Sequence, residues 1–342
     1  MIILGTSINF FLDDSSVEIL LYLTRGDTML EDIGFHGISD SRALRSSMYK
    51  KVPISKCTYC EHVITGKCNF NCSYCNPLSS NDDPSFQEVL NIIDRLSKLG
   101  CKYYHITGGE PTLNQNLISI IKYAYMKGMT VRMSTNGSAD TSYYDEIMRS
   151  GCMSFAISLD TNKDNERQPM FDIVVNNIRN IVAKKANVQI GTVFDDKNIK
   201  DATEIVRFIS SLGVSDIKIG TASQYEQHLV FGSLSSFPNP ILQYRLSRFK
   251  RGRGMRGLVE DDSPKCYLVL DDLTIKGNKH YPCAVYLREG GEPIGELDEK
   301  VFKRRLEWFE EHDSLKDRIC TKYCMDFKCD FNNQAKLFDD QS

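Results

Sequence analysis

The feature that most constrains the fold is a regular alternation of strand-like and helix-like segments between about residue 60 and residue 220. The strand-like segments are short apolar runs, and the segments between them carry apolar residues at helical spacing. The expected strands are Glu61–Gly66, Cys101–Thr107, Thr130–Ser134, Met153–Leu159, Asn187–Phe194 and Asp216–Gly220, and the expected helices are Phe86–Leu99, Leu117–Lys127, Ser142–Ser150, Phe171–Lys184 and Ile199–Leu212. Six β/α units predict an α/β fold with a parallel sheet.

Composition sets broad limits on what this chain can be. Its 342 residues suffice for one large domain and a smaller one, and 41% hydrophobic with 25% charged residues is ordinary for a soluble globular protein. A net charge of −3 gives no overall attraction to nucleic acid or to an anionic membrane. The N-terminus has neither a basic segment nor a cleavage site, so the twelve cysteines are expected to be metal ligands in the cytoplasm rather than disulfides.

Three of these cysteines, Cys68, Cys72 and Cys75, stand at C-x3-C-x2-C spacing directly after the first expected strand. A four-iron cluster needs four protein ligands to be closed, so three thiolates leave one iron open to a small molecule. Open metal positions are where chemistry occurs, as in catalytic zinc sites. A zinc knuckle and three unrelated core thiols are the alternatives.

Polar groups follow the next three strands at the ends where barrel active sites lie. Thr107, Gly108, Gly109 and Glu110 end the second strand, Ser134 and Asn136 end the third, and Ser158 and Asp160 end the fourth. Glycines permit close approach of the backbone to a ligand, and a carboxylate can pair with an ammonium group. The same glycines would also suit a plain turn.

The order and spacing of these motifs resemble the radical S-adenosylmethionine (SAM) superfamily, and the aromatic Tyr74 before the last cysteine fits it too. The resemblance implies a partial (β/α)6 TIM-like barrel, with SAM on the open iron of a [4Fe–4S] cluster. It further implies that the Gly-Gly-Glu turn binds the SAM amine. The other strand-end groups would contact its carboxylate and ribose. The implied activity is reductive cleavage of SAM to a 5′-deoxyadenosyl radical.

A second group of cysteines follows the barrel. Cys266 is separated from Cys283 by ten residues, Gly277 and five residues, and Cys320, Cys324 and Cys329 follow. This pattern resembles the SPASM/twitch extension of radical SAM enzymes, with one residue more after the glycine. The resemblance implies one auxiliary [4Fe–4S] cluster held by Cys266, Cys283, Cys320 and either Cys324 or Cys329. A zinc ion with four thiolates is the rival.

The remaining cysteines are less informative. Cys57 and Cys60 either join a metal site or are idle thiols, and Cys101 and Cys152 are expected in the core.

The expected organisation is an N-terminal extension of unknown role over 1–55, the barrel over 56–235, and a small cysteine-rich auxiliary-cluster domain over 236–342. The expected function is a net oxidation or a bond-forming modification of a peptide or a small molecule. The expected partner is an electron donor such as flavodoxin or ferredoxin. No association with a membrane is expected. The only support for a nucleic-acid modifier is the basic run from Arg245 to Arg256. A solvated linker is the alternative interpretation of that run. A non-catalytic iron–sulfur or zinc protein is the other alternative.

Overall fold

The computed structural model describes residues 58–72, 75, 83–160, 168–195, 197–221, 248 and 250–339. The extension over 1–55, Cys57, Tyr74, Arg245 and the expected domain boundary at 235 lie outside these residues.

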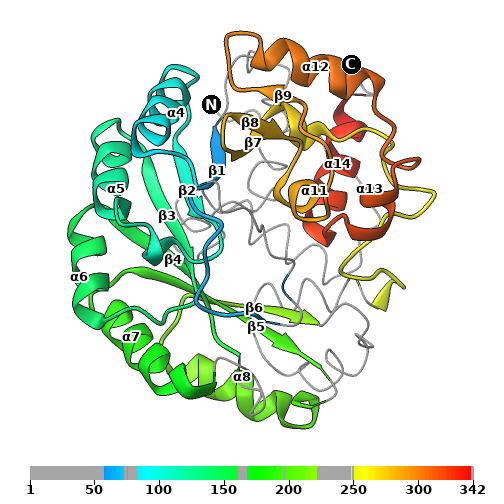
Figure 1. Ribbon diagram of the computed structural model, residues 1–342. Helices are drawn as coiled ribbons and strands as arrows, with labels where there is room; N and C mark the ends of the chain where they lie inside the picture. Colours follow the sequence, from blue (N-terminus) through cyan, green and yellow to red (C-terminus); the bar gives the residue numbers. More distant parts are fainter. Residues whose placement is uncertain are drawn as a thin grey trace, which may run out of the picture.

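Six parallel strands form the barrel sheet, in the order β6-β5-β4-β3-β2-β1. They are β1 (Tyr59–Val63), β2 (Tyr103–Thr107), β3 (Thr130–Thr135), β4 (Cys152–Ser158), β5 (Asn187–Phe194) and β6 (Asp216–Thr221). The helices between them are α4 (Phe86–Lys98), α5 (Leu117–Met126), α6 (Thr141–Arg149), α7 (Phe171–Ala183) and α8 (Ala202–Ser211). These helices cover the outer face of the curved sheet (Figure 1). The predicted parallel α/β barrel is therefore confirmed.

Helix ends follow the local chemistry of the chain. Ser85 caps α4 in a reciprocal capping box with Glu88, which satisfies two backbone N–H groups at the start of the helix. The predicted helix over Ile199–Leu212 opens with a 3₁₀ turn at Ile199–Asp201 before α8 begins. Strand β1 starts two residues before the predicted Glu61, because the carbonyl of Thr58 already accepts from the backbone of β2.

The sheet does not stop at the barrel. Strand β7 (Asp272–Lys276) pairs in parallel with β1, and β8 (Lys279–Tyr281) and β9 (Gly295–Glu296) extend the sheet to nine strands. An open barrel leaves the edge of β1 without a partner, and β7 fills that edge. The C-terminal region is therefore continuous with the barrel sheet rather than a detached module.

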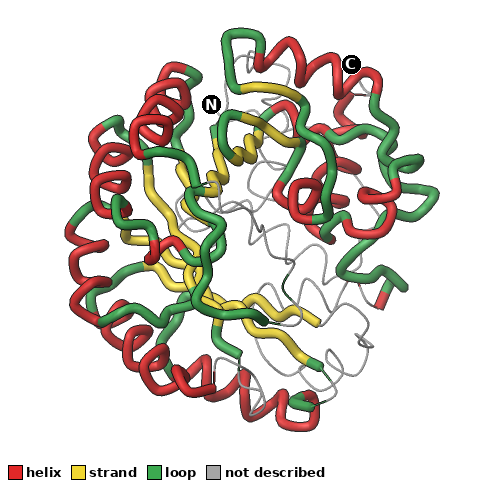
Figure 2. Tube along the Cα trace, viewed as in Figure 1, coloured by secondary structure: helices red, strands yellow, loops and turns green. Residues whose placement is uncertain are grey.

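Four helices complete the described C-terminal region beside the β7–β8 hairpin (Figure 2). They are α11 (Ala284–Arg288), α12 (Val301–Glu311), α13 (Arg318–Tyr323) and α14 (Asp326–Asp339). Arg305 of α12 is fully buried, and it donates to the backbone carbonyls of Val269, Tyr281 and Asp272. This one guanidinium ties α12 to the base of the hairpin. Among the described residues, no helix is long and apolar enough to cross a membrane.

Candidate functional site

The three-cysteine segment leaves the carboxyl end of β1. Cys68 and Cys75 are exposed, and Cys72 is buried. The backbone N–H of Phe70 lies 3.4 Å from the Cys68 sulfur, and the N–H of Cys75 donates to the carbonyl of Cys72 at 3.0 Å. Two accessible thiols flanking a turn at the barrel mouth suit a metal cluster with an open side. Tyr74 lies outside the described residues.

Gly108 and Gly109 hold this segment against the end of β2. The N–H of Gly109 donates to Thr65 at 3.0 Å, and that of Glu110 donates to Lys67 at 2.7 Å. A Cβ at Gly108 would lie 2.4 Å from the carbonyl oxygen of Thr65, and one at Gly109 would lie 2.3 Å from that of Lys67. No side chain fits at such distances, so both glycines are needed for backbone-to-backbone contact. Their neighbours are residues 65–67, directly before Cys68. The sequence predicts the two glycines against the ligand and does not predict this contact.

The carboxylate of Glu110 is fully buried and bridges the ends of β2 and β3. One oxygen accepts from Thr112, through its N–H at 3.1 Å and its hydroxyl at 2.7 Å, and from the Thr135 hydroxyl at 2.8 Å. The other accepts from the N–H of Asn136 at 2.6 Å. Burial raises the pKa of Glu110, and these hydrogen bonds oppose that shift. The predicted SAM-amine ligand therefore already serves four donors of its own chain.

Asn69 links the cysteine segment to the third motif. Its amide oxygen accepts from Asn136 at 2.8 Å, and its amide nitrogen donates to the Ser138 hydroxyl at 2.9 Å. Sequence reasoning missed Asn69, although a polar side chain inside a cysteine loop was the available signal. Together with the glycine contacts, this link brings the motifs after β1, β2 and β3 to one mouth of the barrel.

The motif after β4 lies one strand further along. The Asp160 carboxylate is buried and lies 3.3 Å from the N–H of Val193 at the end of β5, and Ser158 is half-buried. Ser158 is the last residue of β4 and Asp160 follows it, so both lie at the carboxyl end of this strand, as predicted.

The inner face of the barrel is polar. Tyr104, Ile106, Val131 and Met133 belong to the core under the helices, so the alternate side chains of β2 and β3 point to the opposite face. On that face His105 joins the Tyr59 hydroxyl at 2.6 Å and the Ser134 hydroxyl at 2.8 Å.

A second polar chain crosses the same face. Arg132 donates to Gln189, and Gln189 donates to Asp216, each at 2.8 Å. Burial, followed by the charges of Arg132, Lys218 and Arg288, holds the pKa of His105 well below its usual value. A half-buried neutral imidazole among cations suits a polar substrate group rather than an apolar one.

The C-terminal cysteines converge on one cavity. Its lining includes the four cysteines Cys266, Cys283, Cys320 and Cys324, together with Tyr286, Trp308, Lys328 and Asn332. Burial and the neighbouring Cys283 raise the pKa of Cys266 to about 11, and burial with the thiols of Cys266 and Cys283 raises that of Cys320. The raised pKa values mean that thiolates formed together in this space would repel one another. A cationic iron–sulfur core or zinc would neutralise that charge, so the cavity fits either.

Cys329 is placed differently from the other four. Its side chain is fully buried and lies 3.6 Å from the carbonyl oxygen of Gly257. A hydrogen bond with Cys329 comes first among the causes that raise the pKa of Cys324. The two thiols are therefore neighbours, but only Cys324 faces the cavity.

The other described cysteines lie in the hydrophobic core. Cys60, Cys101 and Cys152 are buried in the barrel core, as expected for Cys101 and Cys152.

The arginines of the basic run have carboxylate partners. Arg248 is buried and paired with Asp330, and Arg253 binds the Asp262 carboxylate through contacts of 2.8 and 2.7 Å. Arg256 lies 3.7 Å from Glu289. Arg248 and Arg253 are held in buried or half-buried ion pairs, so the solvated-linker interpretation is wrong for these two, and little of their charge is left for phosphates. Arg256 is exposed.

Comparison with known proteins agrees with this geometry. The Radical SAM superfamily model matches residues 62–209. The GTP 3′,8-cyclase of Staphylococcus epidermidis is 30% identical over 169 residues, covering 46% of this chain and 46% of the cyclase. The mycofactocin maturase MftC of Mycobacterium tuberculosis is 28% identical over 162 residues, covering 44% and 41%. The chain thus spans less than half the length of these curated relatives.

Solved structures share the fold over a longer stretch. The chain of anSMEcpe with bound AdoMet and the Cp18Cys peptide has a TM-score of 0.57 at 13% identity, and the match covers 84% of this chain and 97% of that one. Streptococcus suis SuiB bound to the precursor peptide SuiA has a TM-score of 0.55 at 13% identity, covering 80% and 69%. At this level of identity the likeness concerns the fold.

Proposed function

Because this chain belongs to the radical SAM superfamily, we propose that it binds SAM on a [4Fe–4S] cluster held by Cys68, Cys72 and Cys75. When bound and reduced, the cluster and SAM would supply a 5′-deoxyadenosyl radical that abstracts a hydrogen atom from a substrate carbon. The protein's contribution is binding, orientation and exclusion of competing reactions.

The observation that carries the proposal is the joining of three strand-end motifs at one mouth of the barrel. The backbone N–H groups of Gly109 and Glu110 bind the residues just before Cys68. Glu110 also fixes the end of β3 relative to β2, and Asn69 links the cysteine segment to Asn136. The SAM-binding roles of Thr107, Ser134, Ser158 and Asp160 remain part of the proposal. So does that of Tyr74.

The C-terminal cavity supports an auxiliary [4Fe–4S] cluster with Cys266, Cys283, Cys320 and Cys324 as its ligands. Four thiolates close a cluster, which leaves no iron open for substrate and favours electron transfer. Arg288 of α11 reaches Thr107 at 3.4 Å, so this region meets the barrel beside the Gly-Gly-Glu turn. The proposed reaction is therefore a net oxidation, including oxidative bond formation.

The substrate is proposed to be a peptide side chain or a small molecule with polar groups. The Tyr59–His105–Ser134 and Arg132–Gln189–Asp216 chains on the inner face support a hydrophilic occupant of the barrel. The relatives include an enzyme named for GTP and structures with bound peptides, so both substrate classes stay within the proposal. A flavodoxin or ferredoxin in the cytoplasm is the proposed electron donor.

The direct test is anaerobic reconstitution with iron and sulfide, followed by incubation with SAM and dithionite. We expect about eight irons per chain, as two four-iron clusters, and 5′-deoxyadenosine detected by liquid chromatography. Iron without 5′-deoxyadenosine would support a non-catalytic protein and contradict the proposal. Four irons with one zinc would contradict only the auxiliary cluster.

The auxiliary ligands can be separated one by one. Cys324→Ala and Cys266→Ala are expected to lose the same auxiliary signal in electron paramagnetic resonance and about four irons. Cys329→Ala is the matched control in the neighbouring helix α14, and it should keep both because its thiol lies outside the cavity lining. SAM cleavage should persist in all three. Loss of iron in Cys329→Ala with retention in Cys324→Ala would reverse the assignment.

A further inference from the structure

Three nitrogen atoms surround the proposed auxiliary ligands, and each lies beside a different sulfur. The Asn332 amide nitrogen is 3.7 Å from Cys266 Sγ, the Tyr286 backbone nitrogen is 3.4 Å from Cys283 Sγ, and His312 Nε2 is 3.9 Å from Cys320 Sγ. The three donors come from α14, α11 and the residue that ends α12. They thus approach the cavity from separate elements.

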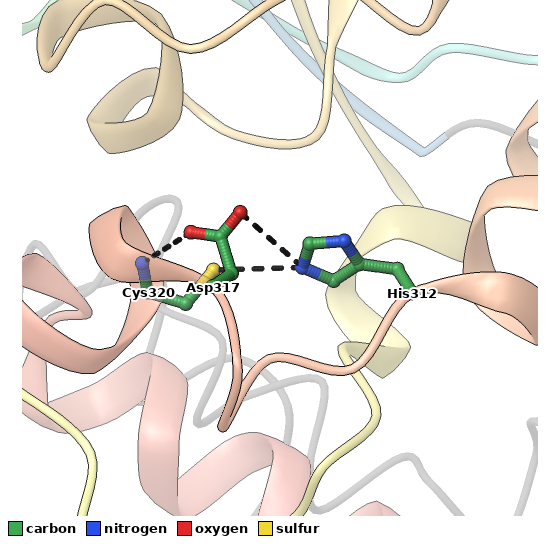
Figure 3. A group of neighbouring side chains, drawn as sticks. All are labelled: His312, Asp317 and Cys320. Carbon is green, nitrogen blue, oxygen red and sulfur yellow. Dashed lines mark hydrogen bonds and ion pairs between the residues drawn. The ribbon is translucent and has the colours of Figure 1, made fainter.

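Two contacts with Trp308 fix the position of His312. Its ring stacks on Trp308 with the ring centroids 3.8 Å apart and an interplanar angle of 16°. Its backbone N–H donates to the Trp308 carbonyl at 2.9 Å, which ends α12. Both contacts hold the imidazole with Nε2 toward Cys320 and Asp317 (Figure 3).

Asp317 connects the imidazole to the cysteine. One carboxylate oxygen accepts from the backbone N–H groups of Ile319 and Cys320 and so caps α13, at 2.7 and 2.9 Å. The other accepts from the Tyr286 hydroxyl at 3.0 Å and lies 3.9 Å from His312 Nε2. Because a carboxylate and a sulfur both face Nε2, the ring tautomer with the proton on Nε2 is favoured. Nε2 is then a donor to Cys320.

We propose that hydrogen bonds from these three donors set the reduction potential of the auxiliary cluster. The donor on His312 raises this potential, so that the cluster accepts an electron from the substrate. This rests on the proposed function, because it requires iron at the four cysteines. A hydrogen bond to a ligating sulfur stabilises the more negative, reduced form, so it raises the potential. In the reaction, the substrate carbon radical loses one electron, the cluster gains it, and the substrate proton passes to water.

The experiment uses the full chain with Cys68, Cys72 and Cys75 changed to Ala, so that only the auxiliary cluster is observed. Its midpoint potential is measured by redox titration monitored by electron paramagnetic resonance. In this background His312→Phe keeps a ring to stack on Trp308 but removes the donor. His312→Gln is the matched variant, since its amide nitrogen can still donate.

We expect His312→Phe to retain about four irons and to shift the reduction equilibrium roughly tenfold toward the oxidised form, a lowering of about 59 mV for one electron. His312→Gln should lie near the parent. An unchanged potential in His312→Phe with full iron would overturn the proposal. Loss of iron from both variants would also overturn it, because His312 would then be a ligand. A parent protein that holds zinc would instead refute the auxiliary cluster itself.

Discussion

Replacing Cys68, Cys72 and Cys75 together with Ala is expected to abolish formation of 5′-deoxyadenosine and to remove about half of the bound iron. The three thiolates are the proposed ligands of the SAM cluster, and their segment lies at the barrel mouth, apart from the C-terminal cavity. The auxiliary iron should therefore stay. Iron analysis and chromatography of the SAM products measure the two effects separately.

Fold stability should change little in this triple variant. Cys68 and Cys75 are exposed, so little packing is lost with them, and the buried Cys72 loses only its sulfur atom. Cys101→Ala is a suitable control, because it makes the same chemical change at a buried core cysteine and should leave iron and SAM cleavage intact. If the triple variant still produced 5′-deoxyadenosine, the cluster would have to lie elsewhere. If it lost all of its iron, the two sites would not be independent.

The barrel could be predicted from sequence because its signals are local. Apolar runs give the strands, and Ser85 with Glu88 gives the start of a helix within four residues of chain. The spacing of Cys68, Cys72 and Cys75 is a local signal too, because it spans only eight residues of chain. Each strand prediction lay within about two residues of the observed bounds, apart from the displaced end of β1.

The features that sequence reasoning missed depend on residues far apart in the chain. The pairing of β7 with β1 joins segments more than 200 residues apart, and the Asn69–Asn136 contact spans 67 residues. The same holds for the cavity: spacing could not separate Cys324 from Cys329, because both follow Cys320 at short, ligand-like intervals. In the structure Cys324 ends α13, whereas Cys329 lies in α14. Only the direction of each thiol distinguishes them.

Glu110 shows how the structure changes an expected mechanism. If its carboxylate mainly pairs with the SAM amine, Glu110→Gln should weaken SAM binding and leave the stability of the SAM-free protein unchanged. If it mainly serves the four internal donors, the same change should destabilise the protein before any SAM is added. The geometry favours the second outcome, because the carboxylate is fully buried and already accepts from four donors of its own chain.

We therefore expect Glu110→Gln to lower the free energy of unfolding by about 1–3 kcal/mol, and Glu110→Ala to lower it by more. A glutamine amide cannot accept from both the Thr112 and Asn136 N–H groups, and each buried donor left without an acceptor costs about 1–3 kcal/mol. Urea unfolding of the SAM-free protein measures this loss. SAM affinity should fall as well, since the ends of β2 and β3 are no longer held together.

Glu88→Gln provides the matched control on the exposed surface. Its oxygen accepts from the Ser85 N–H at 2.7 Å, an interaction that an amide oxygen can replace at this exposed position, so stability should change little. A stability of Glu110→Gln equal to that of Glu88→Gln, together with weakened SAM binding, would return Glu110 to the role of a direct ligand. Equal stability with unchanged SAM affinity would mean that the Gly-Gly-Glu turn depends on its glycine contacts alone.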